Sequence, residues 1–250
     1  MEKRRIILLR HGQSQWNKEN RFTGWVDVPL TAEGEAEARQ AARLISEAGL
    51  QPRKAYTSYL KRAIKTLWIC LEELDLMHIP VLTSWRLNEK HYGQLTGLNK
   101  SETAARHGEE QVKLWRRAYD VAPPPLDPQS PYHPVNDLRY AEVPPHLLPA
   151  TESLKNTIER LLPLWEHQMA PEIRNTPGDY FVVAHGNSLR GLIKFLMAWD
   201  EQRILEFNLP TGIPYVLELD AQMRVIYDSF LISQEELERK MAEVAAQGKQ

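Results

Sequence analysis

Residues 5–12, RIILLRHG, combine a run of aliphatic side chains with an abrupt polar ending. The four consecutive aliphatic residues at 6–9 are typical of a strand that is buried on both faces. The run stops at His11 and Gly12, where the chain has to leave the strand. A second stretch, VVAHG at 182–186, ends in the same way. The two stretches predict two buried strands, each delivering a histidine and a glycine at its carboxyl end.

Strands and helices alternate in the prediction on either side of these two stretches. Further strands are expected over 54–58, 80–84, 215–219 and 224–230, and helices over 31–48, 60–76, 109–118, 152–169 and 189–198. This alternation predicts an α/β protein, a three-layer α/β/α fold with a mostly parallel central sheet. Ligands of such sheets bind beyond the carboxyl ends of the strands, which places the expected active site next to the two histidines.

The length of 250 residues fits one domain spanning 1–250, with enough chain to bury a sizeable core. One segment differs in character, since residues 121–150 contain nine prolines. Because this segment also carries aromatic and leucine side chains, it is interpreted as an insertion packed across the surface. Residues 231–250 are expected to form a C-terminal helix and tail.

Charge and cysteine content exclude several classes of protein. A formal net charge of -2 gives no overall attraction to nucleic acid or to an anionic membrane. The single cysteine, Cys70, excludes an intramolecular disulfide and a cysteine-based metal site. The apolar run that ends at Leu9 is too short for a signal peptide, and no stretch is long enough to span a membrane. A cytoplasmic protein is expected.

Cations lie beside turns and predicted helix ends along the chain: Arg10, Arg21, Arg62, Lys100, Arg116 and Arg117. The planar arginine guanidinium matches phosphate oxygens with two parallel hydrogen bonds. The sequence contains no phosphate-binding G-x-x-x-x-G-K-[ST] loop, no G-x-G-x-x-G and no H-E-x-x-H zinc motif. Phosphate chemistry here would therefore use a histidine nucleophile and arginine electrostatics, with no metal ion.

Six longer segments carry a family resemblance: RHGQSQWNKENRFTGW at 10–25, YTSYLKRAIKTLW at 56–68, LNEKHYGQLTGLNK at 87–100, EEQVKLWRRAYDV at 109–121, AHGNSLRGLIK at 184–194 and LPTGIPYVLELD at 209–220. Together they resemble the cofactor-dependent phosphoglycerate mutases of the histidine phosphatase superfamily over essentially the whole chain. The family also has an insertion like the proline-rich one, which helps to cover its active site. A homodimer is the default assembly that the resemblance implies.

The resemblance implies a ping-pong phosphoryl transfer that interconverts 3-phosphoglycerate and 2-phosphoglycerate in glycolysis and gluconeogenesis. His11 is similar to the nucleophile that becomes phosphorylated, primed by 2,3-bisphosphoglycerate as the cofactor. Glu89 matches the general acid and base for the substrate hydroxyl, and His185 matches the histidine that stabilises charge on the transferring group. Arg10 and Arg62 match the clamp on that group. The substrates would be small phosphorylated three-carbon acids.

The resemblance also implies a set of substrate-binding residues, which share positions in the six segments: Ser14, Asn17, Thr23, Gly24, Tyr92, Lys100, Arg116, Arg117, Gly186 and Asn187. Among them, Arg116 and Arg117 are expected to hold the phosphate far from His11. Lys100 and Tyr92 are expected near the carboxylate of the substrate.

Two residues depart from the family pattern. Gln13 stands where most of the mutases have Glu, and the loss of a carboxylate beside His11 should make the pocket more positive. Lys90 replaces the usual Arg, which keeps the charge but loses the geometry for two parallel hydrogen bonds.

Three other functions stay open at this point. A bisphosphoglycerate synthase of the same family typically has Gly in place of Ser14 and Cys-Ser in place of Thr23-Gly24, so both positions favour a mutase. Simple phosphatases of the superfamily lack the proline-rich insertion and the Arg116-Arg117 pair. A binding module that senses phosphorylated ligands without catalysis would need a defect at the nucleophile, the acid and base or the second histidine, and all three are intact.

Overall fold

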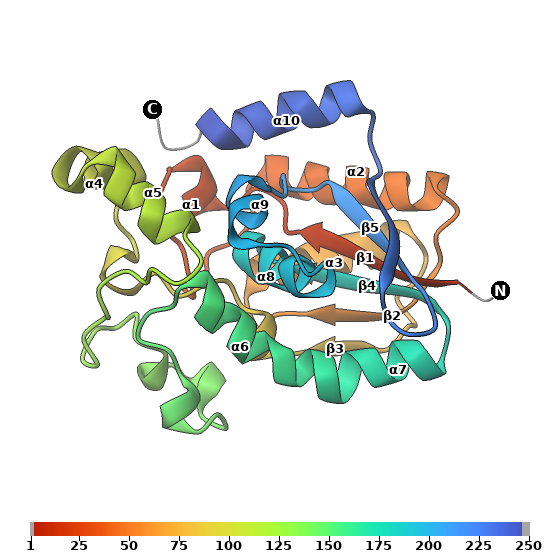
Figure 1. The fold of residues 1–250 in the computed structure, drawn as a ribbon, viewed down its shortest axis with the longest axis horizontal. Coiled ribbons are helices and arrows are strands. Elements are labelled where there is room, and N and C mark those ends of the chain that lie inside the picture. The colour runs from red at the N-terminus through yellow and green to blue at the C-terminus, as the bar shows by residue number, and fades with distance from the viewer. Residues whose placement is uncertain (1–2, 247–250) are drawn as a thin grey trace.

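The computed structural model describes residues 3–246 of the chain (Figure 1). Its strands are β1 (Arg4–Arg10), β2 (Pro52–Thr57), β3 (Val81–Thr83), β4 (Gly178–Ala184), β5 (Pro214–Leu219) and β6 (Val225–Phe230). Its α-helices are α1 (Gln15–Lys18), α2 (Ala32–Glu47), α3 (Lys61–Glu73), α4 (Lys100–His107), α5 (Glu109–Arg117), α6 (Leu154–Leu164), α7 (Ala170–Asn175), α8 (Gly186–Leu196), α9 (Glu201–Glu206) and α10 (Gln234–Ala246).

The strands form one sheet in the order β3-β2-β4-β1-β5-β6. The pairs β2–β3, β2–β4 and β1–β4 are parallel, whereas β5 pairs antiparallel with both β1 and β6. The two antiparallel pairs lie at one edge, so the expectation of a mostly parallel sheet is confirmed. The β1–β4 register opposes Arg10 and Ala184, the last residues of both strands.

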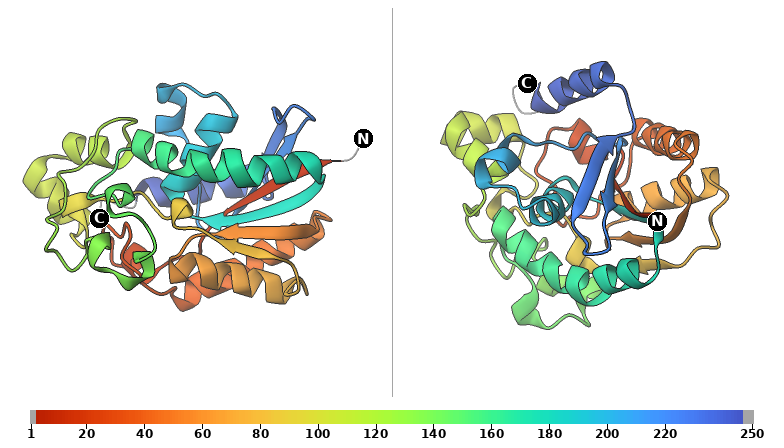
Figure 2. Two further views of the ribbon diagram at one scale, coloured as in Figure 1. Left: turned by 90° about the horizontal axis from the view of Figure 1, so that it is seen from below. Right: turned by 45° about the vertical axis from the view of Figure 1, so that its right-hand side comes forward.

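Alternate side chains of the central strands enter two separate cores, because successive residues of a strand point to opposite faces. Ile6 and Leu8 of β1 pack with α6, α7 and α8, while Ile7 and Leu9 pack with α2 and α3. Figure 2 (left) shows the resulting layers, with α6 and α7 on one side of the sheet and α2 and α3 on the other. The side chains of these four aliphatic residues of β1 are fully buried, which explains the unbroken aliphatic run.

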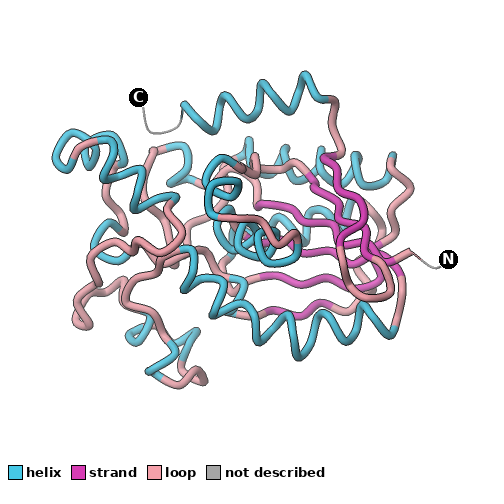
Figure 3. The backbone as a smooth tube through the Cα atoms, viewed as in Figure 1, coloured by secondary structure: helices cyan, strands magenta, loops and turns pink. Residues whose placement is uncertain are grey.

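The carboxyl ends of the parallel strands open onto a region built mainly of loops and short helices. Helices α4 and α5 and the proline-rich segment gather at that end of the molecule (Figure 1), and most of the loop colour lies there as well (Figure 3). The loop that follows β1 lies directly against the start of α2. A Cβ atom on Gly12 would come within 2.0 Å of the Gly34 carbonyl oxygen, so glycine is required for this approach.

The proline-rich segment packs against Trp25 and Asn88. It forms three 3₁₀ turns, at Pro134–Asn136, Leu138–Tyr140 and Pro145–Leu147. Tyr140 packs against Trp25, and its hydroxyl accepts a hydrogen bond from Asn88 Nδ2. Among the residues that the structure describes, none from 121–150 lines the pocket described below, and the cover over the active site that the resemblance implies stays a prediction.

Several element boundaries differ from the prediction. The helix expected to end at 169 continues through a π-helical turn, Trp165–Met169, into α7 although the segment contains Pro163 and Pro171. The predicted helix over 189–198 begins earlier, at Gly186, directly after His185. Short helices α1 and α9 carry too little periodicity to be seen in the sequence. The last four residues of the expected C-terminal tail, 247–250, lie outside the described part of the chain.

Candidate active site

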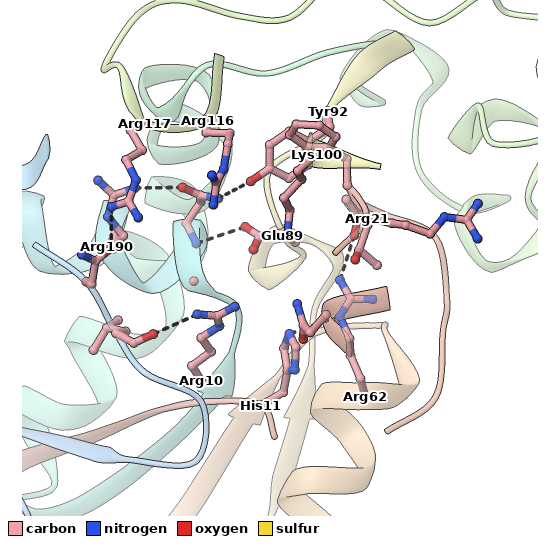
Figure 4. A pocket seen from close by; sticks show the side chains of 18 residues that line it. Arg10, His11, Arg21, Arg62, Glu89, Tyr92, Lys100, Arg116, Arg117 and Arg190 are labelled. Carbon is pink, nitrogen blue, oxygen red and sulfur yellow. Dashed lines mark hydrogen bonds between the residues drawn. The ribbon is translucent and has the colours of Figure 1, made fainter. Parts of the chain in front are cut away.

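A pocket opens at the carboxyl ends of β1 and β4 and is lined mainly by cationic side chains (Figure 4). Its lining includes Arg10, Arg21, Arg62, Lys100, Arg116, Arg117 and Arg190. Glu89 is the single carboxylate among the described residues that line it. The guanidinium group of Arg21 turns away and donates to the Gly97 carbonyl, whereas the other cations border the pocket. Such an excess of positive charge suits a ligand with several negative charges.

His11 presents a lone pair to the pocket through its Nε2 atom. Its Nδ1 lies 2.7 Å from the carbonyl oxygen of Gly12, which accepts, so the ring proton is held on Nδ1. Arg62 Nε donates to His11 Nε2 over 3.2 Å, which requires Nε2 to be unprotonated. Burial, followed by repulsion from Arg62 and Arg10, keeps the pKa of His11 well below its usual value. His11 is therefore neutral with a defined tautomer, the state that a nucleophilic histidine requires.

His185 lies directly behind His11, as the neighbouring parallel strands require. The two ring centroids are 5.0 Å apart at an interplanar angle of 62°. His185 is fully buried, and its Nε2 lies 2.8 Å from the Ser58 hydroxyl. Burial, followed by repulsion from Arg62, also lowers its pKa well below the usual value. The sequence prediction that the two strands bring their histidines together is confirmed.

Arg62 and Arg10 are fixed by backbone carbonyl groups on opposite sides of His11. Arg62, in the first turn of α3, donates to the carbonyl oxygens of Val26 and Gly24 in addition to His11. Burial lowers the pKa of Arg62 to about 10, which leaves it charged at neutral pH. Arg10 donates through one terminal nitrogen to Leu209 over 3.0 Å. Its Nε is buried and has no hydrogen-bond partner within residues 3–246.

Glu89 faces the two histidines from the loop that follows β3. Its Oε1 accepts from the backbone N–H of Asn187 at 3.1 Å and from that of Lys90 at 2.7 Å. Trp25 Nε1 donates to the Glu89 carbonyl oxygen over 2.6 Å, and Arg160 also donates to it. These contacts fix both the backbone and one carboxylate oxygen of the residue.

The far side of the pocket is built by α4, α5 and α8. Burial, followed by repulsion from Arg116 and Arg10, lowers the pKa of Lys100 to about 7. The same crowding of cations accompanies burial in lowering the pKa of Arg116 and of Arg117. Arg117 donates to the side chain of Asn208, and Asn187 Nδ2 donates to the Tyr92 hydroxyl over 3.0 Å.

Most of the residues expected at the site line this pocket: Arg10, His11, Asn17, Thr23, Gly24, Arg62, Glu89, Tyr92, Lys100, Arg116, Arg117, Gly186 and Asn187. His185 lies behind His11 and does not line the pocket. Ser14 does not line the pocket; its fully buried side chain caps α1 and donates to Asn17, and its expected ligand contact stays a prediction. The side chain of Gln13 also lies outside the lining, where it accepts a hydrogen bond from Thr31. The expected effect of Gln13 on pocket charge is therefore not supported.

Four lining residues were not predicted from the sequence: Phe22, and Arg190, Asn208 and Leu209 from the C-terminal third of the chain. Arg190 is one helical turn after Asn187 and donates to its side chain over 2.9 Å. That spacing is a signal that could have found Arg190. Asn208 and Leu209 lie in a loop before β5 and reach the site only through the fold.

Within the described residues, no three His, Cys, Asp or Glu side chains lie close enough together to hold a metal ion. The same part of the chain contains no helix long and apolar enough to cross a membrane.

Comparisons with known proteins agree with this geometry. Residues 6–136 match the Histidine phosphatase superfamily (branch 1). The chain is 55% identical over 244 residues to a 2,3-bisphosphoglycerate-dependent phosphoglycerate mutase of Parabacteroides distasonis, covering 98% of both chains. The fold is similar to that of a solved mycobacterial hydrolase, at a TM-score of 0.69 and 23% identity over 92% of this chain and 99% of that one.

A mycobacterial glucosyl-3-phosphoglycerate phosphatase has a similar fold as well, at a TM-score of 0.66 and 24% identity over 86% of this chain and 92% of that one. These likenesses to solved structures show the fold alone. The sequence identity over nearly the full length shows the family as well. The chain belongs to the 2,3-bisphosphoglycerate-dependent phosphoglycerate mutases of the histidine phosphatase superfamily.

Proposed function

We propose that this chain interconverts 3-phosphoglycerate and 2-phosphoglycerate, a step of glycolysis and gluconeogenesis, by carrying a phosphoryl group on His11. The observation that supports the mechanism most directly is the orientation of the His11 ring. Its protonated Nδ1 is tied to Gly12, and its Nε2 lone pair faces a pocket rich in arginine. The 55% identity to a 2,3-bisphosphoglycerate-dependent phosphoglycerate mutase supports the same reaction.

In the proposed chemistry, the Nε2 lone pair of His11 forms a bond to phosphorus while the bond from phosphorus to the substrate oxygen breaks. Glu89 donates a proton to the leaving oxygen in this direction and accepts the proton of the attacking hydroxyl in the other. Arg10 and Arg62 offset the negative charge that develops on the phosphoryl oxygens. His185, buried behind His11, is proposed to stabilise that charge as well.

The residues present fit 2,3-bisphosphoglycerate. The unpartnered Nε of Arg10 is a buried donor at the His11 end, and a Cβ atom on Gly186 would stand 3.5 Å from it and 3.7 Å from Glu89 Oε2. The absence of a side chain there leaves space between the two groups. Arg116 and Arg117 would hold the second phosphate, and Lys100 with Tyr92 the carboxylate. When bound, this cofactor supplies the phosphoryl group that first loads His11.

The remaining elements of the proposal concern location and assembly. We place the enzyme in the cytoplasm, treat residues 1–250 as one domain, and expect a homodimer with neither nucleic acid nor membrane as a partner. A dimer is supported by exposed apolar side chains on α3 and at the sheet edge β3: Trp68, Met77 and Val81. Trp68 is 61% exposed and lies outside the core, which leaves interface packing as its predicted role. Light scattering after size-exclusion chromatography tests this assembly, and a monomer would contradict it.

An assay coupled to enolase tests the function. The purified chain is supplied with 3-phosphoglycerate, with and without 2,3-bisphosphoglycerate, and in the presence or absence of EDTA. We expect 2-phosphoglycerate production that depends on the bisphosphate and survives chelation. Release of inorganic phosphate as the main product would indicate a phosphatase, net formation of the bisphosphate would indicate a synthase, and ligand binding without turnover would indicate a sensing module.

A further inference from the structure

Lys90 is a buried cation that follows Glu89 directly but does not line the pocket. Its side chain is completely inaccessible to solvent. Its Nζ donates to two backbone carbonyl oxygens, that of Trp115 at 2.6 Å and that of Arg116 at 3.2 Å. Both carbonyl groups belong to the last turn of α5, the helix that carries Arg116 and Arg117.

The carbonyl groups at the end of α5 require hydrogen-bond donors from outside the helix. The last four carbonyl groups of an α-helix lack donors within the helix and carry partial negative charge. The N–H of Ala118 serves the Leu114 carbonyl. Lys90 serves the next two carbonyls along the chain, and a lysine side chain is a favourable partner at this end of a helix.

Besides the hydrogen bond from Arg117 to Asn208 and the ring contact between His107 and Trp115, helix α5 is attached by a small apolar contact. Of its nine residues, Val112 is the one with a buried side chain, and it packs with Phe22 and Leu95. Trp115 contributes a partly buried ring to the same cluster, while Leu114 is 46% exposed. Apolar packing therefore anchors the middle of the helix, and the two hydrogen bonds of Lys90 anchor its end.

We propose that Lys90 is a positioning residue, which fixes the end of α5 against the Glu89 loop and so places Arg116 and Arg117 for the phosphate far from His11. This inference rests on the proposed function of the site. The backbone supports it, because the N–H of Lys90 donates to Glu89 Oε1. One residue thus contacts the acid and base through its backbone and the arginine pair through its side chain.

The charge state of Lys90 is compatible with this role. Burial lowers the pKa of Lys90 to about 7, with Glu89 and Glu152 opposing the shift and Arg190 and Arg116 adding to it. A neutral amine keeps two N–H groups, one for each carbonyl. The Tyr92 ring lies over the amine, with Nζ 4.9 Å from the ring centroid. Lys90 can therefore hold the helix without adding a further full charge to the crowded pocket.

The test is a double-mutant cycle between Lys90→Met and Arg116→Ala, measured as the KM for 3-phosphoglycerate, kcat and the calorimetric Kd for 2,3-bisphosphoglycerate. Methionine keeps the length and removes the donors. We expect Lys90→Met to weaken binding about 10-fold with a smaller change in kcat, since binding at the far phosphate is lost while the reacting end is kept. In the Arg116→Ala background, Lys90→Met should weaken binding less than about 3-fold. The effects of two substitutions do not add when one residue acts through the other.

Two conservative variants complete the design. Lys90→Arg keeps donors for both carbonyls and should restore the Kd to within about 3-fold of the original chain. Lys90→Gln keeps a single donor group and should give an intermediate Kd, and it takes the place of Lys90→Met if that variant does not fold. Equal effects of Lys90→Met with and without Arg116 would overturn the proposal, as would a loss confined to the melting temperature. If the original chain binds no bisphosphate, the proposed function is wrong. If Arg116→Ala weakens binding but the Lys90 variants do not, only the proposed role of Lys90 is wrong.

Discussion

At the scale of single residues, the chemistry depends on which nitrogen of His11 carries the proton. The Gly12 carbonyl can accept a hydrogen bond from Nδ1 but cannot donate one, so the lone pair is assigned to Nε2 without any ligand. The cations around the ring have two effects on the site. They oppose protonation of His11 and favour the arrival of an anion, so the same charges both keep the nucleophile active and bind its substrate.

Glu89→Gln should separate catalysis from binding. Glutamine retains an oxygen that can accept from the N–H groups of Asn187 and Lys90, so the loop should keep its position. It cannot exchange a proton with the substrate hydroxyl, and kcat should fall by about 10²–10⁴-fold. The Kd for substrate should change little, because ground-state binding rests on the arginines.

Measuring kcat, Kd and the melting temperature on the same Glu89→Gln protein distinguishes this role from a structural one. A variant with nearly normal kcat but weaker binding and a lower melting temperature would remove Glu89 from the chemistry and leave it as an anchor of the loop.

Residues that follow strands or sit in distinctive motifs were predictable from the sequence, whereas residues delivered by the fold were not. His11 and His185 were found because each ends an aliphatic run. The cap that Ser14 forms on α1 was not predicted, because motif position does not say whether a hydroxyl faces a ligand or caps a helix. Asn208 and Leu209 have no local pattern, and they reach Arg117 and Arg10 through long-range contacts.

At the scale of elements, α6 holds the Glu89 loop through one buried arginine. Arg160 donates to the carbonyl oxygens of Trp85, Arg86, Asn88 and Glu89, and it forms an ion pair with Glu152 at 2.6 Å. Both charged side chains are buried. No motif marked Arg160, because its role appears only when α6 lies against the loop.

Arg160→Met should destabilise the fold strongly, since it leaves the Glu152 carboxylate buried without its cation. The expected loss in the free energy of unfolding is about 3–5 kcal/mol, measured by chemical denaturation. The double variant Arg160→Met with Glu152→Gln removes the unpaired charge and should recover part of that loss. A double variant whose loss equals the sum of two large single losses would show that the ion pair is not the source of the effect.

The secondary structure at this scale followed from periodicity where helices are long and amphipathic, as for α2 and α3. The sequence did not reveal that the proline-rich segment packs behind Trp25, since a prediction of loop carries no position in space. It also missed the continuation past residue 169, where a π-helical turn leads into α7 although Pro171 follows.

At the scale of the whole molecule, a chain of net charge -2 concentrates its cations in one pocket. Burial, followed by repulsion from Arg116 and Arg10, lowers the pKa of Lys100 to about 7 from an ordinary value of 10.5. A group with a depressed cationic pKa binds fewer protons in the folded state than in the unfolded state between these two values. Its contribution to stability therefore rises as the pH increases through that range.

Binding of 2,3-bisphosphoglycerate should reverse this shift, because the ligand supplies the missing negative charge. We expect proton uptake on binding between about pH 7 and pH 9.5, and an affinity that weakens as the pH rises through that range. Calorimetry in two buffers with different ionisation enthalpies measures the uptake directly. Lys100→Met should reduce it, and equal heats in both buffers would contradict the expectation.

The most direct test of the account is the transfer of label from 2,3-bisphosphoglycerate to the protein. After incubation with the labelled bisphosphate, the original chain should carry an acid-labile phosphoryl group on His11. His11→Ala should lose both that label and turnover, while His185→Ala should remain labelled at His11, though more slowly. A phosphoryl group found on His185, or turnover that survives in His11→Ala, would contradict the assignment of His11 as the nucleophile.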